Sequence, residues 1–157
     1  MKENTSEYLP AIMNVFTAAC VFLFSFLVDF RFSLSREIAK TIGFLLVGIG
    51  MTMVLYAALY VKGAFLGEVE PRLKVLVKDG LYLMVRHPVY LGMTIALAGI
   101  PVALRSWVGL IGVLVLFLPS EIYRVKLEEK ALSNMFGGGW DNYAAQTGFI
   151  LPLIGRK

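Results

Sequence analysis

The chain has 157 residues, of which 58% are hydrophobic and 17% charged, and its mean hydropathy is +0.73. Soluble domains carry about 25% charged and 45–50% apolar residues, so this composition excludes an ordinary soluble domain and predicts a single integral-membrane domain over residues 1–157. The net charge of +4 comes from basic residues that lie between apolar blocks, where they favour anionic membrane surfaces over nucleic acid. The single cysteine, Cys20, excludes an internal disulfide.

Two apolar blocks near the amino terminus are long enough to cross a membrane, and we expect residues 1–61 to form two transmembrane helices. The first block, residues 9–28, is twenty residues without a charge, which a helix would extend over about 30 Å. Its flank carries both charge signs and no small-residue cleavage site follows, so we expect a retained span and not a signal peptide. The second block, residues 42–61, contains Gly43, Gly48 and Gly50, small residues of the kind that let membrane helices approach closely.

A polar segment, residues 62–87, separates these blocks from two shorter ones. We expect that segment outside the membrane, and residues 88–104 and 107–118 as a helical hairpin that just spans it. Arg105 and Ser106 form the predicted turn.

Pro119 is expected to end the apolar run, and a charged helix follows it. Ser120 is a suitable cap for that helix, and Gly137 to Gly139 should stop it. The same glycines are a candidate hinge that would let the carboxy-terminal tail close as a lid. The predicted fold is therefore an all-α membrane protein with about four transmembrane helices, the last two a short hairpin, plus a cytosolic C-terminal helix and tail.

Lysine and arginine counts predict the orientation. With four crossings, eleven of these residues fall on the side of both termini: Lys2, Lys62, Arg72, Lys74, Lys78, Arg86, Arg124, Lys126, Lys130, Arg156 and Lys157. Four fall on the other side: Arg31, Arg36, Lys40 and Arg105. The excess predicts a cytoplasmic location for the first side. No charged residue lies in the middle of an expected span, which argues against an ion or proton path.

The stretch VRHPVYLG, residues 85–92, contains the only histidine. Pro88 suits the first turn of a helix, which puts His87 at the cap, where free N–H groups and the helix dipole favour an anion. The alternative is that Arg86 and Tyr82 simply anchor the helix at lipid headgroups. Both interpretations remain open from these residues alone.

A second polar group follows the last apolar block. Arg124 and Glu128 are four residues apart and so share a helix face, where they could simply pair. Glu129 and Lys130 are most simply solvated surface. Three tyrosines could each be interface-belt aromatics: Tyr82, Tyr90 and Tyr143.

Taken together, these residues form an ordered series: Gly80-x-Tyr82, Arg86-His87-Pro88-x-Tyr90-x-Gly92, Glu128-Glu129, Phe136-Gly137, Tyr143 and FILP at 149–152. The series resembles the integral-membrane methyltransferases typified by isoprenylcysteine carboxyl methyltransferase, with phosphatidylethanolamine methyltransferases as relatives. The resemblance covers residues 75–152, about half of the chain.

The resemblance implies that residues 62–157 form a catalytic core that binds S-adenosyl-L-methionine, without a metal. The cofactor-binding residues that it implies are Lys74, Leu76, Val77, Tyr82, His87, Pro88, Tyr90 and Glu128. The implied catalytic residues are Glu128, which meets the cofactor, and Arg124, which orients the substrate. The expected reaction is direct methyl transfer to a lipophilic acceptor, such as an isoprenylcysteine-type carboxylate or a lipid amine or thiol, that arrives from the membrane lipid.

Two alternatives compete with this interpretation. Membrane sterol reductases have a related carboxy-terminal core and bind NADPH, but in them the position of Pro88 is typically not proline. A small non-catalytic scaffold is the other alternative, and it predicts no cofactor affinity.

Overall fold

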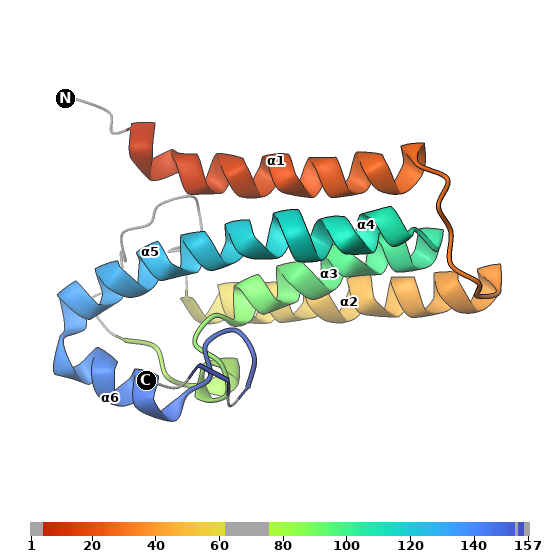
Figure 1. Cartoon of the computed structure of the whole chain (residues 1–157). Coiled ribbons are helices and arrows are strands. Elements are labelled where there is room, and N and C mark those ends of the chain that lie inside the picture. The colour runs from red at the N-terminus through yellow and green to blue at the C-terminus, as the bar shows by residue number, and fades with distance from the viewer. Residues whose placement is uncertain (1–4, 62–75, 153, 156–157) are drawn as a thin grey trace.

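The structure is a computed structural model that describes residues 5–61, 76–152, 154 and 155. This described part is helical, with two isolated bridges and no named strand, so the all-α expectation is confirmed. Its elements are α1 (Thr5–Leu27), α2 (Arg36–Val61), the 3₁₀ helix η1 (Gly80–Leu83), α3 (Pro88–Leu104), α4 (Trp107–Gly112), the π-helical η2 (Val113–Phe117), α5 (Leu118–Phe136) and α6 (Gly138–Gln146). The long helices lie side by side along one direction, and α6 packs at one end of them (Figure 1).

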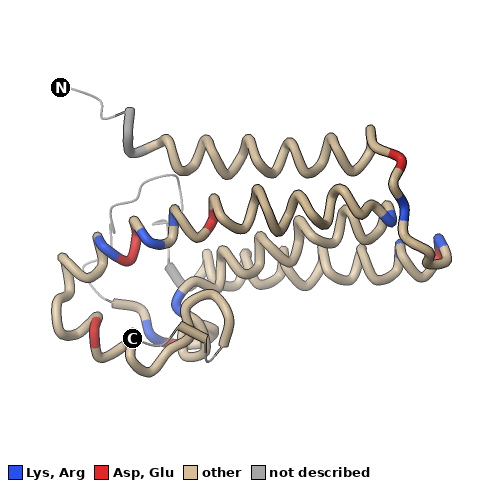
Figure 2. Tube along the Cα trace, viewed as in Figure 1, with Lys and Arg blue, Asp and Glu red and all other residues tan. Residues whose placement is uncertain are grey.

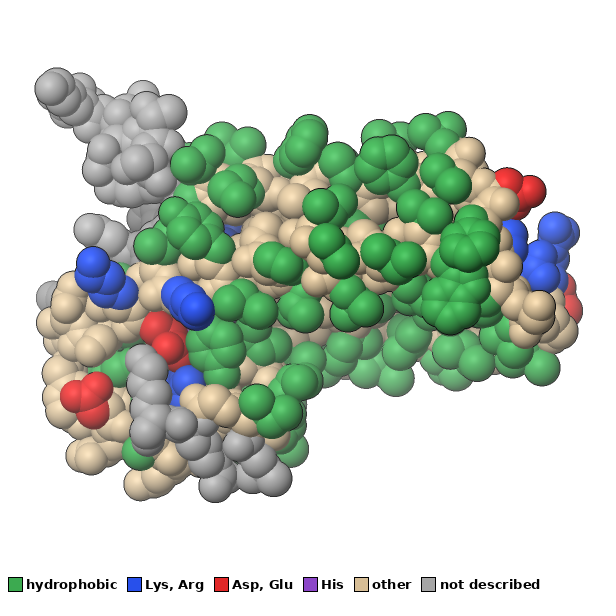
Figure 3. Space-filling model, viewed as in Figure 1, with side chains coloured by type: hydrophobic (Ala, Val, Ile, Leu, Met, Phe, Trp, Pro, Cys, Tyr) green, Lys and Arg blue, Asp and Glu red, His purple; other side chains and the backbone are tan. Residues whose placement is uncertain are grey.

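Three helical stretches are long and apolar enough to cross a membrane: Tyr8–Leu27, Arg36–Leu59 and Trp107–Phe136. Their outward side chains are hydrophobic and exposed, as for Phe16 at 67% and Leu59 at 75%. Such side chains cover the length of the bundle (Figure 3). An exposed apolar surface of this extent is unfavourable in water but stable in contact with lipid. Helix α3 is apolar but has only 17 residues, the lower limit for a span, so the fourth crossing stays a prediction.

The apolar run ends before Pro119 as expected, but the predicted start of a separate charged helix there is wrong. Helices α4, η2 and α5 form one continuous stretch from Trp107 to Phe136. A proline lacks an N–H and its ring crowds the carbonyl four residues earlier, and the wider π-helical turn directly before α5 accommodates that misfit. Ser120 is therefore no cap, since its hydroxyl donates to the Phe117 carbonyl oxygen at 2.9 Å. Glu121 also lies inside a candidate span, against expectation.

The glycine run ends α5 as predicted but then begins another helix. Gly137 has φ 51° and closes α5 by donating its N–H to the Ser133 carbonyl oxygen, a backbone conformation that glycine adopts readily. The next two glycines start α6, which the sequence did not predict. Buried Trp140, Tyr143 and Ala144 hold α6 against Leu132, Phe136 and Leu76.

Paired glycines bring α2 and α3 into close backbone contact. A Cβ added to Gly43 would lie 2.6 Å from the Gly99 carbonyl oxygen, and one added to Gly99 would lie 2.6 Å from that of Gly43. Gly50 and Gly92 stand in the same mutual relation seven residues along each helix. The packing role predicted for Gly43 and Gly50 is confirmed, whereas that for Gly48 is wrong, because a Cβ there meets nothing within 4 Å.

Buried polar groups attach α1 to α5. The Asn14 amide donates to Oε1 of Glu121 at 2.7 Å, and the Thr17 and Ser120 hydroxyls lie 3.0 Å apart. Glu121 has 0% of its surface exposed. Beside them, Val21 packs against Val113 and Phe117, so both polar and apolar contacts fix this helix.

The predicted turn between α3 and α4 is confirmed at the opposite end of the bundle from α6. Arg105 adopts a left-handed conformation with φ 61°, and the Ser106 hydroxyl accepts from the Gly109 N–H to cap α4. The guanidinium of Arg31 donates to the Leu104 carbonyl oxygen at 2.6 Å. Charged residues gather at the two ends of the bundle and leave its middle almost free of them (Figure 2).

The glycine contacts predict a sharp contrast between two substitutions on α2. Gly50→Ala should destabilise the fold by about 1–3 kcal/mol, because the new methyl group overlaps the Gly92 carbonyl oxygen and the backbone of α3. Gly48→Ala should be neutral or stabilising, since it meets open space and raises helix propensity. Thermal unfolding in detergent measures both, and equal effects of the two substitutions would contradict the close packing.

Candidate active site

The motif that contains the only histidine opens α3 as predicted. His87 is the N-cap residue and Pro88 the first residue of the helix. Just before them, the Arg86 N–H donates to the Gly148 carbonyl oxygen at 2.8 Å, and the Gly148 N–H donates to that of Met84. The carboxy-terminal segment therefore lies directly against the motif.

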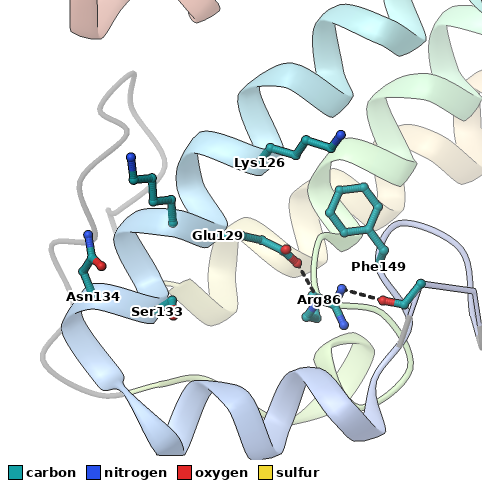
Figure 4. A pocket seen from close by; sticks show the side chains of 8 residues that line it. Arg86, Lys126, Glu129, Ser133, Asn134 and Phe149 are labelled. Atoms are coloured by element: carbon teal, nitrogen blue, oxygen red, sulfur yellow. Dashed lines mark hydrogen bonds and ion pairs between the residues drawn. The ribbon is translucent and has the colours of Figure 1, made fainter. Parts of the chain in front are cut away.

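Arg86 is buried and bonded to several segments at once. Its Nε donates to Glu129 Oε1 at 2.6 Å, and its Nη groups donate to the carbonyl oxygens of Ala144, Thr147 and Gly155 at 2.6 to 2.9 Å. With 3% of its surface exposed, it does not anchor at headgroups, so that interpretation is wrong. Glu129, 5% exposed, is not solvated surface either. Figure 4 shows the ion pair between α5 and the start of α3.

His87 is buried beside the same carboxylate. Its Nε2 lies 3.4 Å from Glu129 Oε1, and its ring makes edge contacts with Tyr90 and Phe149. Glu129 therefore lies between Arg86 and His87 and fixes the position of the ring.

Tyr90 connects the two residues that were expected to pair with each other. Its hydroxyl donates to Glu128 Oε2 at 2.8 Å, and the Arg124 guanidinium carbon lies 5.6 Å from its ring centre. No ion pair between Arg124 and Glu128 occurs in the described part of the chain, so simple pairing of the two is wrong. The half-buried cation and carboxylate are each held by the tyrosine and are left available to a ligand.

Tyr82 and Tyr143 complete this end of the bundle. The Tyr143 hydroxyl donates to the Tyr82 carbonyl oxygen at 2.7 Å, and the Tyr82 side chain packs against Val54, Ala57 and Val89. Burial raises the pKa of both phenols, and the nearby Glu128 carboxylate raises the pKa of Tyr82 further. Both hydroxyls thus remain protonated. Tyr90 and Tyr143 are buried, so their interpretation as interface-belt aromatics is wrong.

The other predicted cofactor residues lie at the edge of this group or outside it. Leu76 is half-buried against the Trp140 and Tyr143 cluster, and Val77 beside it in sequence is also half-buried. Lys74 lies outside the described residues. The structure thus brings together Tyr82, His87, Pro88, Tyr90, Arg124 and Glu128.

The chemistry of these side chains suits a ligand that carries both charge signs. A carboxylate and tyrosine faces favour sulfonium and ammonium groups, and Arg124 favours a carboxylate. Within the described residues no group of three His, Cys, Asp or Glu side chains could hold a metal ion. The residues present therefore fit S-adenosyl-L-methionine.

The fold and site define a helical membrane protein with a polar site at one end of its bundle. The chain belongs to the phospholipid methyltransferase family, whose model matches residues 38–139. That stretch contains α3 with its preceding motif, and both Arg124 and Glu128.

Individual relatives point to the same kind of protein. The chain is 38% identical over 80 residues to methanethiol S-methyltransferase of Pseudomonas deceptionensis, covering 49% of this chain and 28% of the relative. It is 30% identical over 138 residues to protein-S-isoprenylcysteine O-methyltransferase of Saccharomyces cerevisiae, covering 85% and 57%, and 28% identical over 139 residues to that of Schizosaccharomyces pombe, covering 86% and 57%. The resemblance to the isoprenylcysteine carboxyl methyltransferases is thereby confirmed. The chain spans 28% to 57% of the length of these curated relatives.

The sequence did not predict that Arg86 and Glu129 pair beside the candidate site. The available signal was their adjacency to the predicted residues, since Arg86 precedes His87 and Glu129 follows Glu128. Their contact spans 43 positions of sequence, which no local helix pattern reveals.

Breaking the buried ion pair should unfold the site end of the molecule. Arg86→Gln removes the guanidinium that lies 2.6 Å from Glu129 and leaves three carbonyl groups short of a donor, so we expect a loss of about 3–5 kcal/mol of stability. Arg36→Gln, an exposed change at the other end, should stay within about 0.5 kcal/mol. Thermal unfolding in detergent compares them, and matching midpoints would contradict a structural role for the pair.

Proposed function

We propose that this protein is an S-adenosyl-L-methionine-dependent methyltransferase that methylates a lipophilic acceptor at the cytoplasmic face of a membrane. The observation that carries the proposal is the Tyr90 side chain, which holds the Glu128 carboxylate and the Arg124 cation side by side at the end of an apolar bundle. Family membership and the names of the relatives support it. The charge asymmetry of the loops supports the cytoplasmic orientation.

Glu128 and the tyrosine faces are the residues that would hold the cofactor. The bound cofactor would supply an electrophilic methyl group on a positively charged sulfur. Glu128 stabilises the positive groups, with its carboxylate oriented by the Tyr90 hydroxyl. The Glu128 charge raises the pKa of the Tyr82 phenol, so the two side chains lie close together, and the Tyr82 ring offers an aromatic face to a cation. His87 and Pro88 place the free N–H groups of α3 toward the same end.

Arg124 would orient the acceptor. Its guanidinium lies against the Tyr90 ring and so faces the same region as Glu128. A carboxylate acceptor is already a nucleophile, so the residues need only align it with the methyl group and exclude water. The names of the two yeast relatives, which specify isoprenylcysteine O-methylation, favour such an acceptor.

A thiol or amine acceptor would have to lose a proton during the same reaction. Glu128 is the better candidate to receive it, since it is half-buried whereas His87 is buried beside Glu129. The bacterial relative, named for methanethiol S-methylation, makes a thiol the second acceptor class to test. In each case the exposed apolar helices would let a lipophilic acceptor reach the site laterally from lipid.

Calorimetric titration of the purified protein tests cofactor binding. Saturable binding of S-adenosyl-L-methionine and of its demethylated product, without binding of NADPH, is the expected result. Glu128→Gln should weaken binding at least about tenfold through loss of charge-assisted contacts. Asp141→Asn, an exposed acid on α6, is the matched control and should bind normally. Binding of NADPH alone would move the protein to the reductases, and a folded protein that binds none of them would favour a scaffold.

Arg124→Gln should separate binding from turnover. Cofactor affinity should change less than about threefold, while kcat/KM for a prenylated cysteine carboxylate should fall about 100-fold, because alignment of the acceptor is lost. Radiolabelled methyl transfer to a prenylated cysteine, a lipid amine and an alkyl thiol measures this, with Arg36→Gln as the control. Unchanged turnover with all three acceptors would remove Arg124 from the site.

A further inference from the structure

A basic pocket lies on the side of α5 opposite to Arg124 and Glu128, and it shares Arg86 and Glu129 with the end of the bundle that holds the candidate active site. Lys126 and Lys130 each follow a site residue, Arg124 and Glu128, by two positions, which places them about 200° around the helix. The pocket has a volume of about 520 Å³. Its lining comprises Arg86, Lys126, Glu129, Lys130, Ser133, Asn134, Phe149 and Gly155.

The pocket carries an excess of positive charge. Among the described residues, three cationic side chains and one carboxylate line it, a net charge of +2. The Arg86 charge is balanced by Glu129 within 2.6 Å. Neither lysine forms an ion pair with any residue among 5–61, 76–152, 154 and 155. Ser133 and Asn134 add hydrogen-bond donors (Figure 4), so the site favours an anion with several acceptor oxygens.

The position of the pocket along α5 indicates where that anion comes from. Lys126 lies eight residues, or about 12 Å of helix, after Leu118, the last residue of the apolar run. Exposed hydrophobic side chains, among them Leu116 and Tyr123, precede it on the same stretch. In Figure 3 the basic side chains at this end of the bundle border the hydrophobic surface. A lysine there can lay its stem along apolar surface and keep its ammonium at headgroup level.

We propose that this pocket binds the phosphate diester headgroup of an anionic membrane phospholipid. Lys126 and Lys130 contact the phosphate oxygens, Ser133 and Asn134 bond the remaining headgroup oxygens, and the acyl chains lie along the exposed side chains of η2 and α5. Because the pocket faces away from Arg124 and Glu128, this lipid is not the methyl acceptor. Its binding does not depend on the proposed methyltransferase activity.

Native mass spectrometry of the detergent-purified protein, titrated with phosphatidylglycerol or phosphatidylcholine, tests the proposal. The wild type should retain phosphatidylglycerol preferentially. Lys126→Gln/Lys130→Gln should weaken its binding about 10- to 30-fold, since each lysine near an anionic headgroup contributes roughly 1 kcal/mol. Lys126→Arg/Lys130→Arg, which keeps the charge, and Lys40→Gln at the opposite end should bind like the wild type.

Equal retention of both lipids, or unchanged affinity in the double glutamine variant, would overturn the proposal. Inorganic phosphate provides a further arm: if millimolar phosphate displaces the lipid from the pocket as effectively as added phosphatidylglycerol does, the site serves a soluble anion. Calorimetric titration of the same variants with S-adenosyl-L-methionine keeps the two sites separate, because loss of lipid with normal cofactor response affects only the pocket.

Discussion

The buried charge of Arg86 is the constraint on which the site end of the molecule depends. A guanidinium removed from water costs several kcal/mol unless a counter-charge and acceptors surround it. Here Glu129 supplies the charge, while carbonyl groups of α6, its following residue Thr147 and Gly155 supply the acceptors. Lysine could not replace it, because only the planar fork of arginine reaches that many acceptors at fixed angles. The carboxy-terminal segment is thus bound to the start of α3 in one arrangement.

Elsewhere the bundle depends on contacts whose strength does not come from removing apolar surface from water. Lipid chains are as apolar as leucine, so hydrophobic burial gives membrane helices little reason to associate. This chain uses two other means. Reciprocal glycine contacts press α2 against α3, and the Asn14–Glu121 hydrogen bond joins α1 to α5. Since His87 caps α3 and Tyr90 lies in its first turn, the glycine contacts along this helix also set the position of the site.

Features with a local cause could be predicted from sequence, and features with a distant partner could not. The helix start at Pro88 and the end of α5 at Gly137 each follow from the backbone preference of one residue. The Arg105–Ser106 turn follows from two polar residues between apolar blocks and from the Ser106 hydroxyl, which caps α4. The continuation of the helix through Pro119 depends instead on the π-helical turn that precedes it. The burial of Glu129 depends on Arg86, 43 residues away. Helix periodicity suggested a pair between Arg124 and Glu128. Instead, Tyr90 of α3 donates a hydrogen bond to Glu128 and its ring contacts the Arg124 guanidinium.

Helix α5 therefore presents three distinct surfaces at the level where the bundle leaves the apolar region. Arg124 and Glu128 face Tyr90, Glu129 faces the interior with Arg86 and His87, and Lys126 and Lys130 line the basic pocket. Glu129 is common to the last two, since it borders the pocket while fixing the His87 ring. A ligand in the pocket would thus lie against the same ion pair that orders the start of α3.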